Sequence, residues 1–299
     1  MVGLAPLYLD EIPFPGGARI KILRFCSSED THPDHLDFII ARGYAQSFIE
    51  GVLEYLRENR RAWDVVKLES VREDSAIKKF LTESNLGEDL RVECSGKYKC
   101  PYLRIQNGFY DYLKSFSRKK RYNLLRKRKK LLEDRGIVYK ITLQEEDPDQ
   151  YLKDLFTTHA ERARREGRLT SFYGRDKYLF HKMLIGYLSG QDKILLASIY
   201  DGSVPLSLYY CVKHNGKYYY YQTGLSPEGE KKSAGVVLIS SLIEKAYGEG
   251  SKEFDFLRGD EEYKSFWTKT FRLDYSFIMR KNTIFGKLVC GYLKHYGKL

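Results

Sequence analysis

The second half of the chain shows a regular succession of helical and strand-like hydrophobic patterns. Apolar residues recur at helical spacing over 149–166 and 176–188, and aromatic and β-branched runs over 193–200, 204–213 and 217–225 predict three strands. The joints "DGS" and "HNGK" indicate hairpins, because Asp-Gly and Asn-Gly tolerate the positive φ of tight turns. We expect the remainder to be a loop "SPEGEKKSAG", a helix over 234–247, a strand "EFDFLR", a helix over 263–270 and a strand "DYSFIMR".

The first third of the chain repeats the later part of this order in a weaker form. The pattern predicts strands over 2–9, 18–25 and 36–41, a helix over 44–58, a strand over 63–71, a helix over 75–83 and a strand over 102–106. In this copy "WDVVKLE" takes the place that "FDFLRGD" has in the second. The sequence therefore predicts two related α/β units, an incomplete one over 1–110 and a second over 137–299.

A basic segment over 111–136 lies between the two predicted units and is expected to form a connecting helix. Ser117 can cap it, leucines recur at seven-residue spacing, and Gly136 can end it in the left-handed conformation. Nine of the thirteen residues from Arg118 to Lys130 are basic. With its single apolar stripe, this helix is expected on a domain surface or between domains, facing an anionic partner.

Composition bounds the class of protein. A length of 299 residues with 42% hydrophobic residues allows two domains with sizeable cores. No apolar run approaches the roughly 20 residues of a membrane span, and Asp10 and Glu11 stand where a signal peptide would need a cleavage site. We therefore expect a soluble cytoplasmic protein. The net charge of +11 favours an anionic partner such as nucleic acid, a phosphorylated cofactor or a membrane surface.

The five cysteines show no metal-binding spacing. There is no CxxC pair, and the two nearest cysteines, Cys94 and Cys100, have no histidine close in sequence to complete a zinc set. We expect free thiols, mostly buried, and no metal site.

The passage from strand to loop to helix around residue 234 is the first candidate for chemistry. A loop of small residues that enters an amphipathic helix directs backbone N–H groups outward at the positive end of the helix dipole, which suits a phosphate or pyrophosphate. The expected cofactor contacts are Lys232, Ser233, Ala234, Gly235 and Val236. The alternative is an ordinary helix start beside two solvated lysines.

Aromatic and histidine residues supply further candidates. Four consecutive tyrosines, 218–221, place two rings on each face of a strand, so that Tyr219 or Tyr221 could offer a phenol to a substrate. Sheet packing explains such tyrosines equally well. His159 lies at the edge of an apolar helix face and is a candidate base, although a hydrogen-bonded core histidine is the commoner case.

The stretch "FDFLRGDEEYKSFW" places charges within a pattern typical of a core. Alternation along the strand puts Asp255 on a half-buried face near the strand end, where Arg258 is the expected partner. The following helix presents Lys264 between Tyr263 and Trp267. Because ligands bind at strand ends of α/β sheets, these charges are candidates for a working site; a structural ion pair with a surface lysine is the alternative.

These elements resemble the GNAT superfamily of acetyltransferases, and in detail the BioF2-like or CelD-like branch linked to cellulose and exopolysaccharide biosynthesis, which is related to the Fem-type peptidyltransferases. The resemblance rests on "PYLRI", "YLKSFSRKKRYNLLRKRKKL", "LFTTHAERARREGR", "YYYYQTGLSPEGEKKSAGVVLI" and "FDFLRGDEEYKSFW". It implies a mixed α/β tandem GNAT fold whose first unit is truncated. The loop "KKSAGVV" departs from the usual QxxGxG/A form.

The resemblance implies direct transfer of an acyl group, such as acetyl, from acyl coenzyme A to an amine or hydroxyl of a small-molecule or saccharide acceptor. The residues then expected in catalysis are His159, Tyr219, Tyr221, Asp255 and Lys264, and those expected to contact substrate are Gln222, Arg258, Tyr263 and Trp267.

Two alternatives stay open. One is a Fem-like transferase that uses aminoacyl-tRNA, since Lys264 in "YK" resembles the lysine near the end of those domains and the basic helix could hold RNA. The other is non-enzymatic binding of nucleic acid or a membrane surface through Arg118–Lys130, although Tyr122 is the only aromatic residue there for base stacking.

Overall fold

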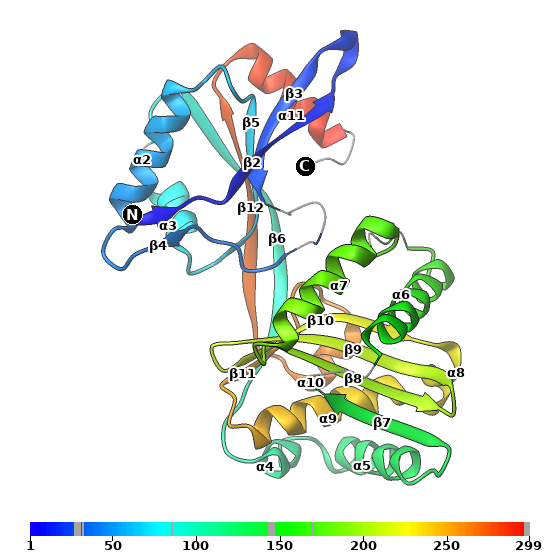
Figure 1. The fold of residues 1–299 in the computed structure, drawn as a ribbon. Helices are drawn as coiled ribbons and strands as arrows, with labels where there is room; N and C mark the ends of the chain where they lie inside the picture. Colours follow the sequence, from blue (N-terminus) through cyan, green and yellow to red (C-terminus); the bar gives the residue numbers. More distant parts are fainter. Residues whose placement is uncertain are drawn as a thin grey trace. The chain divides into compact units, whose positions relative to one another are not determined.

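The computed structural model describes residues 1–26, 31, 33–84, 86–142, 147–168, 170 and 172–295 (Figure 1). The chain forms two compact units. Unit 1 comprises Met1–Cys100, Arg258–Glu261 and Phe271–Leu299, and unit 2 comprises Pro101–Leu257 and Glu262–Thr270. None of the helices in the described part of the chain combines the length and the hydrophobicity needed to span a bilayer.

Unit 2 is built on a mixed sheet in the order β6-β11-β10-β9-β8-β7. β7 to β10 form an antiparallel meander, β11 joins β10 in parallel, and the end of β6 pairs antiparallel with β11. The strands are β6 (Leu90–Arg104), β7 (Ile137–Thr142), β8 (Ile194–Asp201), β9 (Val204–His214), β10 (Lys217–Leu225) and β11 (Glu253–Asp255). The predicted hairpins are confirmed, with Gly202, Asn215 and Gly216 at positive φ.

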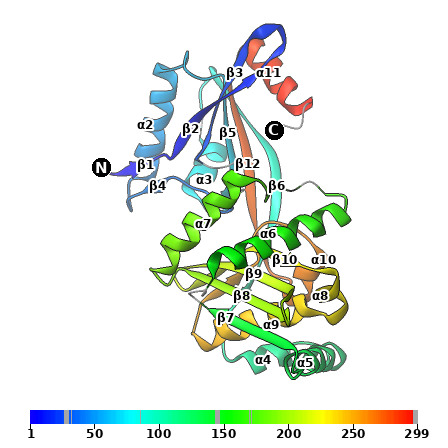
Figure 2. The ribbon, with the colours of Figure 1, turned by 45° about the vertical axis from the view of Figure 1, so that its right-hand side comes forward.

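Helices cover both faces of this sheet (Figures 1 and 2). On one face, two helices pack with Leu152, Leu155 and Ile185 against the apolar side chains of β8 and β9. On the other, Leu238 and Leu242 of a central helix meet the opposite strand face, and the basic helix lies against it. The first pair is α6 (Pro148–Arg165) and α7 (Arg175–Ser189); the second layer is α4 (Phe109–Lys114), α5 (Arg118–Leu132) and α9 (Ala234–Gly248), with α8 (Pro227–Lys232) and α10 (Glu262–Trp267) at its ends.

The main strands of unit 1 follow the order β2-β3-β5-β12-β6. β3 pairs antiparallel with β2 and in parallel with β5, and β12 pairs antiparallel with β5. An amphipathic helix pair covers one face, and the last helix covers part of the other. The elements are β1 (Gly3–Leu4), β2 (Leu7–Pro13), β3 (Arg19–Phe25), β4 (Ile39–Ile40), α2 (Ala45–Glu58), β5 (Val65–Arg72), α3 (Ala76–Glu83), β12 (Phe271–Lys281) and α11 (Ile284–His295).

The predicted internal repeat is present, with an exchange of strands. The order β2, β3, α2, β5, α3, β6 in the first copy matches β9, β10, α9, β11, α10, β12 in the second. Each copy has an antiparallel pair followed by a parallel crossover. The last strand of each copy then continues into the other unit, because β6 reaches β11 of unit 2 and β12 pairs with β5 of unit 1.

Because of this exchange, the two units have different bounds from the domains that we expected, which were 1–110, 111–136 and 137–299. Residues 271–299 belong to unit 1, and the basic segment is part of unit 2, where α5 packs on α9. Ser117 caps α5 as predicted, by accepting a hydrogen bond from the Lys120 N–H. Gly136 is not in the left-handed conformation; α5 ends at Glu133 in ordinary right-handed backbone.

Other differences concern short elements. The expected loop 226–235 contains α8, which Ser226 caps through the Gly229 N–H, and the strand "EFDFLR" stops at Asp255. β7, α4 and α11 were not predicted. Three of the five free cysteines, Cys100, Cys211 and Cys290, are buried.

Candidate functional site

β10 carries an irregularity at the centre of unit 2. Its register with β9 shifts between Tyr220 and Gln222, which leaves Tyr221 as an extra residue. Its parallel pairing with β11 ends at Tyr219 and Asp255, whereas β10 continues to Leu225. β11 therefore does not pair with the second half of β10, where side chains of α6 instead donate to the Thr223 and Leu225 carbonyls.

The N-terminus of α9 opens on a pocket of about 420 Å³. Ser233, in the left-handed conformation, precedes the helix, and no side chain caps it. We call this hollow the basic pocket because five of its lining residues are cations and one is acidic; its lining is Arg126, Lys127, Lys130, Leu131, Asp134, Lys231, Lys232 and Ser233. Such a lining, at the positive end of a helix dipole, suits an anion.

One lysine of the basic pocket already has a carboxylate partner. Lys232 pairs with Asp201, and this hydrogen bond raises the pKa of the Lys232 ammonium. Lys127 and Lys130 are exposed, and no ion pair is described for either within the resolved ranges. The cations of α5 are therefore the more available ones.

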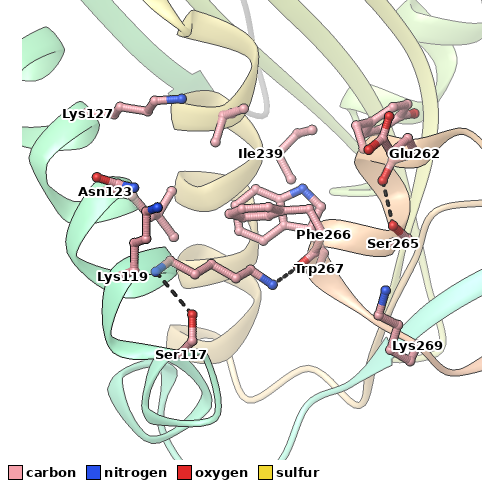
Figure 3. A pocket seen from close by; sticks show the side chains of 14 residues that line it. Ser117, Lys119, Asn123, Lys127, Ile239, Glu262, Ser265, Phe266, Trp267 and Lys269 are labelled. Carbon is pink, nitrogen blue, oxygen red and sulfur yellow. Dashed lines mark hydrogen bonds between the residues drawn. The ribbon is translucent and has the colours of Figure 1, made fainter.

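A second pocket, of about 740 Å³, lies between α5, α9 and α10 (Figure 3). We call it the aromatic pocket. Apolar groups form its floor and lysines its rim; the lining is Ser117, Lys119, Lys120, Asn123, Leu124, Lys127, Val236, Ile239, Glu262, Tyr263, Ser265, Phe266, Trp267 and Lys269. Both pocket volumes fall within or near the range of about 300–1,000 Å³ that is usual for small-molecule sites.

Lys120 is held tightly at this rim. Its ammonium donates to the Phe266 carbonyl and lies 3.6 Å from the ring centroid of Phe116 and 4.1 Å from that of Phe266. Burial lowers the pKa of Lys120, and the nearby charge of Lys269 lowers it further. The cation thus sits in a partly desolvated aromatic setting.

The two pockets share Lys127 and follow one face of α5. Arg128 fixes α5 to α9, since its guanidinium donates to Ser240 Oγ at 2.6 Å and pairs with Glu244. The two pockets are therefore neighbours along α5, one at the start of α9 and the other at α10, and we refer to them together as the groove.

Asp255 ends β11 and Lys264 lies on α10; both are buried, with 0% and 3% exposure, and neither lines the basic or the aromatic pocket. The Leu257 N–H donates to Asp255 Oδ1, and Lys264 Nζ donates to the Leu257 carbonyl. Arg258 belongs to unit 1, where its guanidinium lies 3.9 Å from Asp34 and over the Tyr98 ring.

His159 sits on α6, which covers the face of the sheet opposite α9. Its Nδ1 donates to the Thr223 carbonyl at 2.8 Å, and its Nε2 accepts from Thr170 Oγ1 at 2.9 Å. Burial lowers the pKa of His159 and favours the neutral ring. Both nitrogens are engaged, which is typical of a structural histidine.

The structure brings together some of the expected residues and separates others. Lys232 and Ser233 line the basic pocket, and Val236, Tyr263 and Trp267 line the aromatic one. Tyr219, Tyr221 and Gln222 are half-buried around the β10 irregularity, where the Tyr221 ring packs edge-on to Tyr210.

Sequence reasoning missed Lys120 and Lys127 as pocket residues, although a signal existed. Lys120 and Lys127 stand four residues before and three after the buried Leu124, so they share its helix face. Tyr209 was also missed. Its hydroxyl donates to the Gly235 carbonyl at 3.2 Å, directly behind the start of α9, and burial raises its pKa.

Comparison with known proteins identifies the fold. FemX superposes with a TM-score of 0.60 at 13% identity, over 93% of this chain and 84% of FemX. L-PGS from Bacillus licheniformis gives 0.55 at 11% over 97% and 90%, and the C-terminal domain of a putative lysylphosphatidylglycerol synthetase from Agrobacterium fabrum gives 0.54 at 10% over 90% and 83%. At these identities the likeness shows the fold alone. No curated protein matches the sequence.

The sequence itself matches one protein family. Residues 118–265, just under half of the chain, match the acetyltransferase (GNAT) domain. This range holds α5 and α9 but not Phe266, Trp267 and Lys269 of the aromatic pocket. The predicted mixed α/β GNAT fold is thereby confirmed. Over residues 118–265 the chain is similar to the acetyltransferase (GNAT) domain family.

Proposed function

We propose that this domain transfers an acyl group from acyl coenzyme A to an amine or hydroxyl acceptor. The observation that carries the proposal is the groove of unit 2, in which the basic pocket at the start of α9 lies next to the largely apolar aromatic pocket. The phosphates of the donor would occupy the basic pocket, and its apolar arm would extend along Val236 and Ile239.

The reaction would proceed by direct attack. The acceptor nitrogen or oxygen forms a bond to the thioester carbonyl carbon, the carbon–sulfur bond breaks, and the acceptor's proton ends on the leaving thiolate. The backbone of β10 beside its irregularity would polarise the carbonyl oxygen, because N–H groups that β11 does not cover can point at a developing oxyanion.

The side chains proposed for the acceptor side surround the strand ends. We assign Asp255 and Lys264 to orientation and charge stabilisation, Tyr219, Tyr221 and Gln222 to the acceptor contact near the irregularity, and Arg258 to acceptor binding. His159 is the weakest candidate for the base, because both of its ring nitrogens are already hydrogen-bonded. The proposed acceptor class, a saccharide or other cell-envelope precursor, rests on the sequence resemblance.

Charge reversal in the basic pocket tests the donor assignment. Lys127→Glu and Lys130→Glu should each weaken coenzyme A binding about tenfold in calorimetric titration, which corresponds to about 1.4 kcal/mol. Lys129→Glu is the matched control, since Lys129 is exposed on the same helix but lines neither pocket. If all three variants weaken coenzyme A binding equally, the lysines act only through long-range electrostatic attraction. If Lys127→Glu and Lys130→Glu leave the binding unchanged, the basic pocket does not bind the phosphates.

Aminoacyl transfer from tRNA is the second candidate. It is favoured by the number of α5 cations along the groove and by the likeness of fold to FemX and to a protein named as a lysylphosphatidylglycerol synthetase. Offering acetyl coenzyme A and charged tRNA separately distinguishes the two. Release of free thiol with a panel of amines and amino sugars supports the first candidate, and consumption of charged tRNA alone supports the second.

Simple polyanion binding through Arg118–Lys130 is the non-enzymatic alternative. Several of these cations are committed within unit 2, since Arg128 pairs with Glu244 and Lys120 with the Phe266 carbonyl. Titration with duplex DNA, RNA and anionic vesicles at moderate salt tests it, because a purely electrostatic binder loses affinity steeply as salt rises.

A further inference from the structure

Three potential metal ligands from distant parts of the sequence meet inside unit 1. They are His35, Cys100 and Asp274, and one ligand atom from each lies within 4.8 Å of the other two. Cys100 lies near the end of β6 and Asp274 on β12, and both are 0% exposed, whereas the side chain of His35 is 9% exposed. No sequence spacing could reveal this group, because its members are far apart along the chain.

Hydrogen bonds and strand pairing hold the backbone around His35 and Asp274 in place. Asp274 accepts from the His35 backbone N–H through Oδ2 at 2.8 Å, and its Oδ1 lies 2.9 Å from His35 Nδ1. His35 has a positive φ of 59°, and the next residue, Leu36, is tied to β5 by a hydrogen bond to the Ser70 carbonyl. Asp274 itself pairs in register with Arg72 of β5. Ligands on such elements are preorganised for binding.

The donor set points to a particular class of ion. An imidazole nitrogen, a thiol sulfur and a carboxylate oxygen are ligands that zinc accepts together, whereas calcium and magnesium require oxygen ligands. A nucleophilic role for Cys100 is disfavoured, because its thiol is fully buried and lines neither the basic nor the aromatic pocket.

A fourth group stands beside the trio. Asp34 precedes His35, and its charge interacts with both His35 and Asp274. Its side chain is 9% exposed, and Oδ1 has no hydrogen-bond partner among the residues that the structure describes. The Arg258 guanidinium, 3.9 Å from this oxygen, offsets part of the cost of burying a carboxylate oxygen that has no donor, and a bound cation would offset more of it.

We propose that His35, Cys100 and Asp274 bind a zinc ion in unit 1, with Asp34 as a supporting carboxylate. Binding converts the Cys100 thiol to the thiolate and releases its proton to solvent. The ion ties together the segment at residues 34–36, the end of β6 and the start of β12. Its role is structural, and it is independent of acyl transfer in unit 2.

Cobalt titration of the full chain tests this site directly. After dialysis against a chelator, the protein should bind one equivalent of Co²⁺ with a thiolate-to-cobalt charge-transfer band in the near ultraviolet, and Zn²⁺ should abolish the band. The titration is done in a Cys26→Ser, Cys94→Ser background, because these two thiols are exposed and could bind cobalt adventitiously.

Matched variants locate the ion. Cys100→Ser should remove the band, and Asp274→Asn should weaken cobalt binding at least about tenfold. Cys290→Ser, a buried cysteine of unit 1 outside the trio, should leave both unchanged. Zinc should also raise the melting temperature of the parent protein but not of Asp274→Asn. Absence of the band in the parent, or its persistence in Cys100→Ser or undiminished affinity in Asp274→Asn, would overturn the proposal.

Discussion

Asp255 and Lys264 hold Leu257 from its two sides. Asp255 Oδ1 accepts from the Leu257 N–H at 2.8 Å, and Lys264 Nζ donates to the Leu257 carbonyl at 3.2 Å. Leu257 has a positive φ of 57°, a conformation that costs a non-glycine residue about 1 kcal/mol or more. The two charges therefore stabilise the turn that ends β11, in addition to any part in chemistry.

The hydrogen bond of Asp255 predicts different outcomes for two substitutions. Asp255→Asn retains an oxygen that can accept from the Leu257 N–H, whereas Asp255→Ala leaves that N–H without its partner. We expect the alanine variant to lose about 1–3 kcal/mol of unfolding free energy relative to the asparagine variant. Urea unfolding measures this difference, and equal midpoints for the two variants would contradict the role in the turn.

Lys264→Met separates charge from packing. Methionine fills much of the space of the buried alkyl chain but removes the ammonium. If Lys264 stabilises developing charge as proposed, turnover should fall about thirtyfold to thousandfold, equivalent to about 2–4 kcal/mol of barrier. Lys153→Met on α6 is the control, since Lys153 is exposed. A folded Lys264→Met protein with normal turnover would leave this lysine a purely structural role.

The burial of His181 predicts that unit 2 loses folding stability as the pH falls. The side chain is 2% exposed among aromatic rings, and burial lowers the pKa of His181 from 6.5 to about 4. Between these two pKa values, His181 is therefore protonated in the unfolded chain and neutral in the folded chain. The contribution to stability is fully present above pH 6.5 and is lost as pH falls toward 4, by about 3 kcal/mol in total.

Urea unfolding between pH 4 and 7 checks this dependence. His181→Phe should flatten the decline in that range, because the variant carries no titrating group at this position. His214→Gln, at the exposed end of β9, should keep the slope of the parent. An identical slope in His181→Phe would show that other groups control the acid response.

Gly235 at the start of α9 has little room for a side chain. A Cβ there would lie 3.1 Å from Tyr209 Oη and 3.3 Å from Leu225 Cδ2. Gly235→Leu should lower the unfolding free energy by about 1–3 kcal/mol through overpacking, so loss of ligand binding in this variant would not by itself identify a phosphate seat.

Gly248, at the other end of the same helix, provides the contrast. Apart from its chain neighbours and the backbone of its own helix, no atom lies within 4 Å of a Cβ built there. Gly248→Ala should therefore be neutral or stabilise the protein by up to about 1 kcal/mol. Comparing the melting temperatures of the two variants tests whether crowding, and not loss of glycine as such, destabilises the first.

The parts of the fold that the sequence predicts are those set by local signals. The meander β8 to β10 follows from two hairpin dipeptides, and α9 follows from its helical periodicity. β6 was recognised only at its end, because its first half is polar and takes its place through pairing with a strand far away in sequence. The exchange of β6 and β12 is a non-local choice that no local pattern encodes.

The same distinction holds for the site. Lys232, Ser233 and Val236 could be named from the start of α9 alone. That Lys127 joins them depends on which face of α5 packs on α9, and this is fixed by Leu124 and Leu131 together with Arg128. The metal-ligand group of unit 1 lay beyond sequence reasoning entirely, because three separate segments have to fold before it exists.

The exchanged strands also bear on how the protein is made. β5 lies between β3 and β12, and β12 is synthesised long after β5. During synthesis the nascent unit 1 therefore holds β5, whose residues Val65, Val66 and Leu68 are buried in the finished protein, as an open sheet edge. The N-terminal third cannot finish folding first, as leading domains generally do, and the nascent chain is open to aggregation or chaperone capture until residue 281 has emerged.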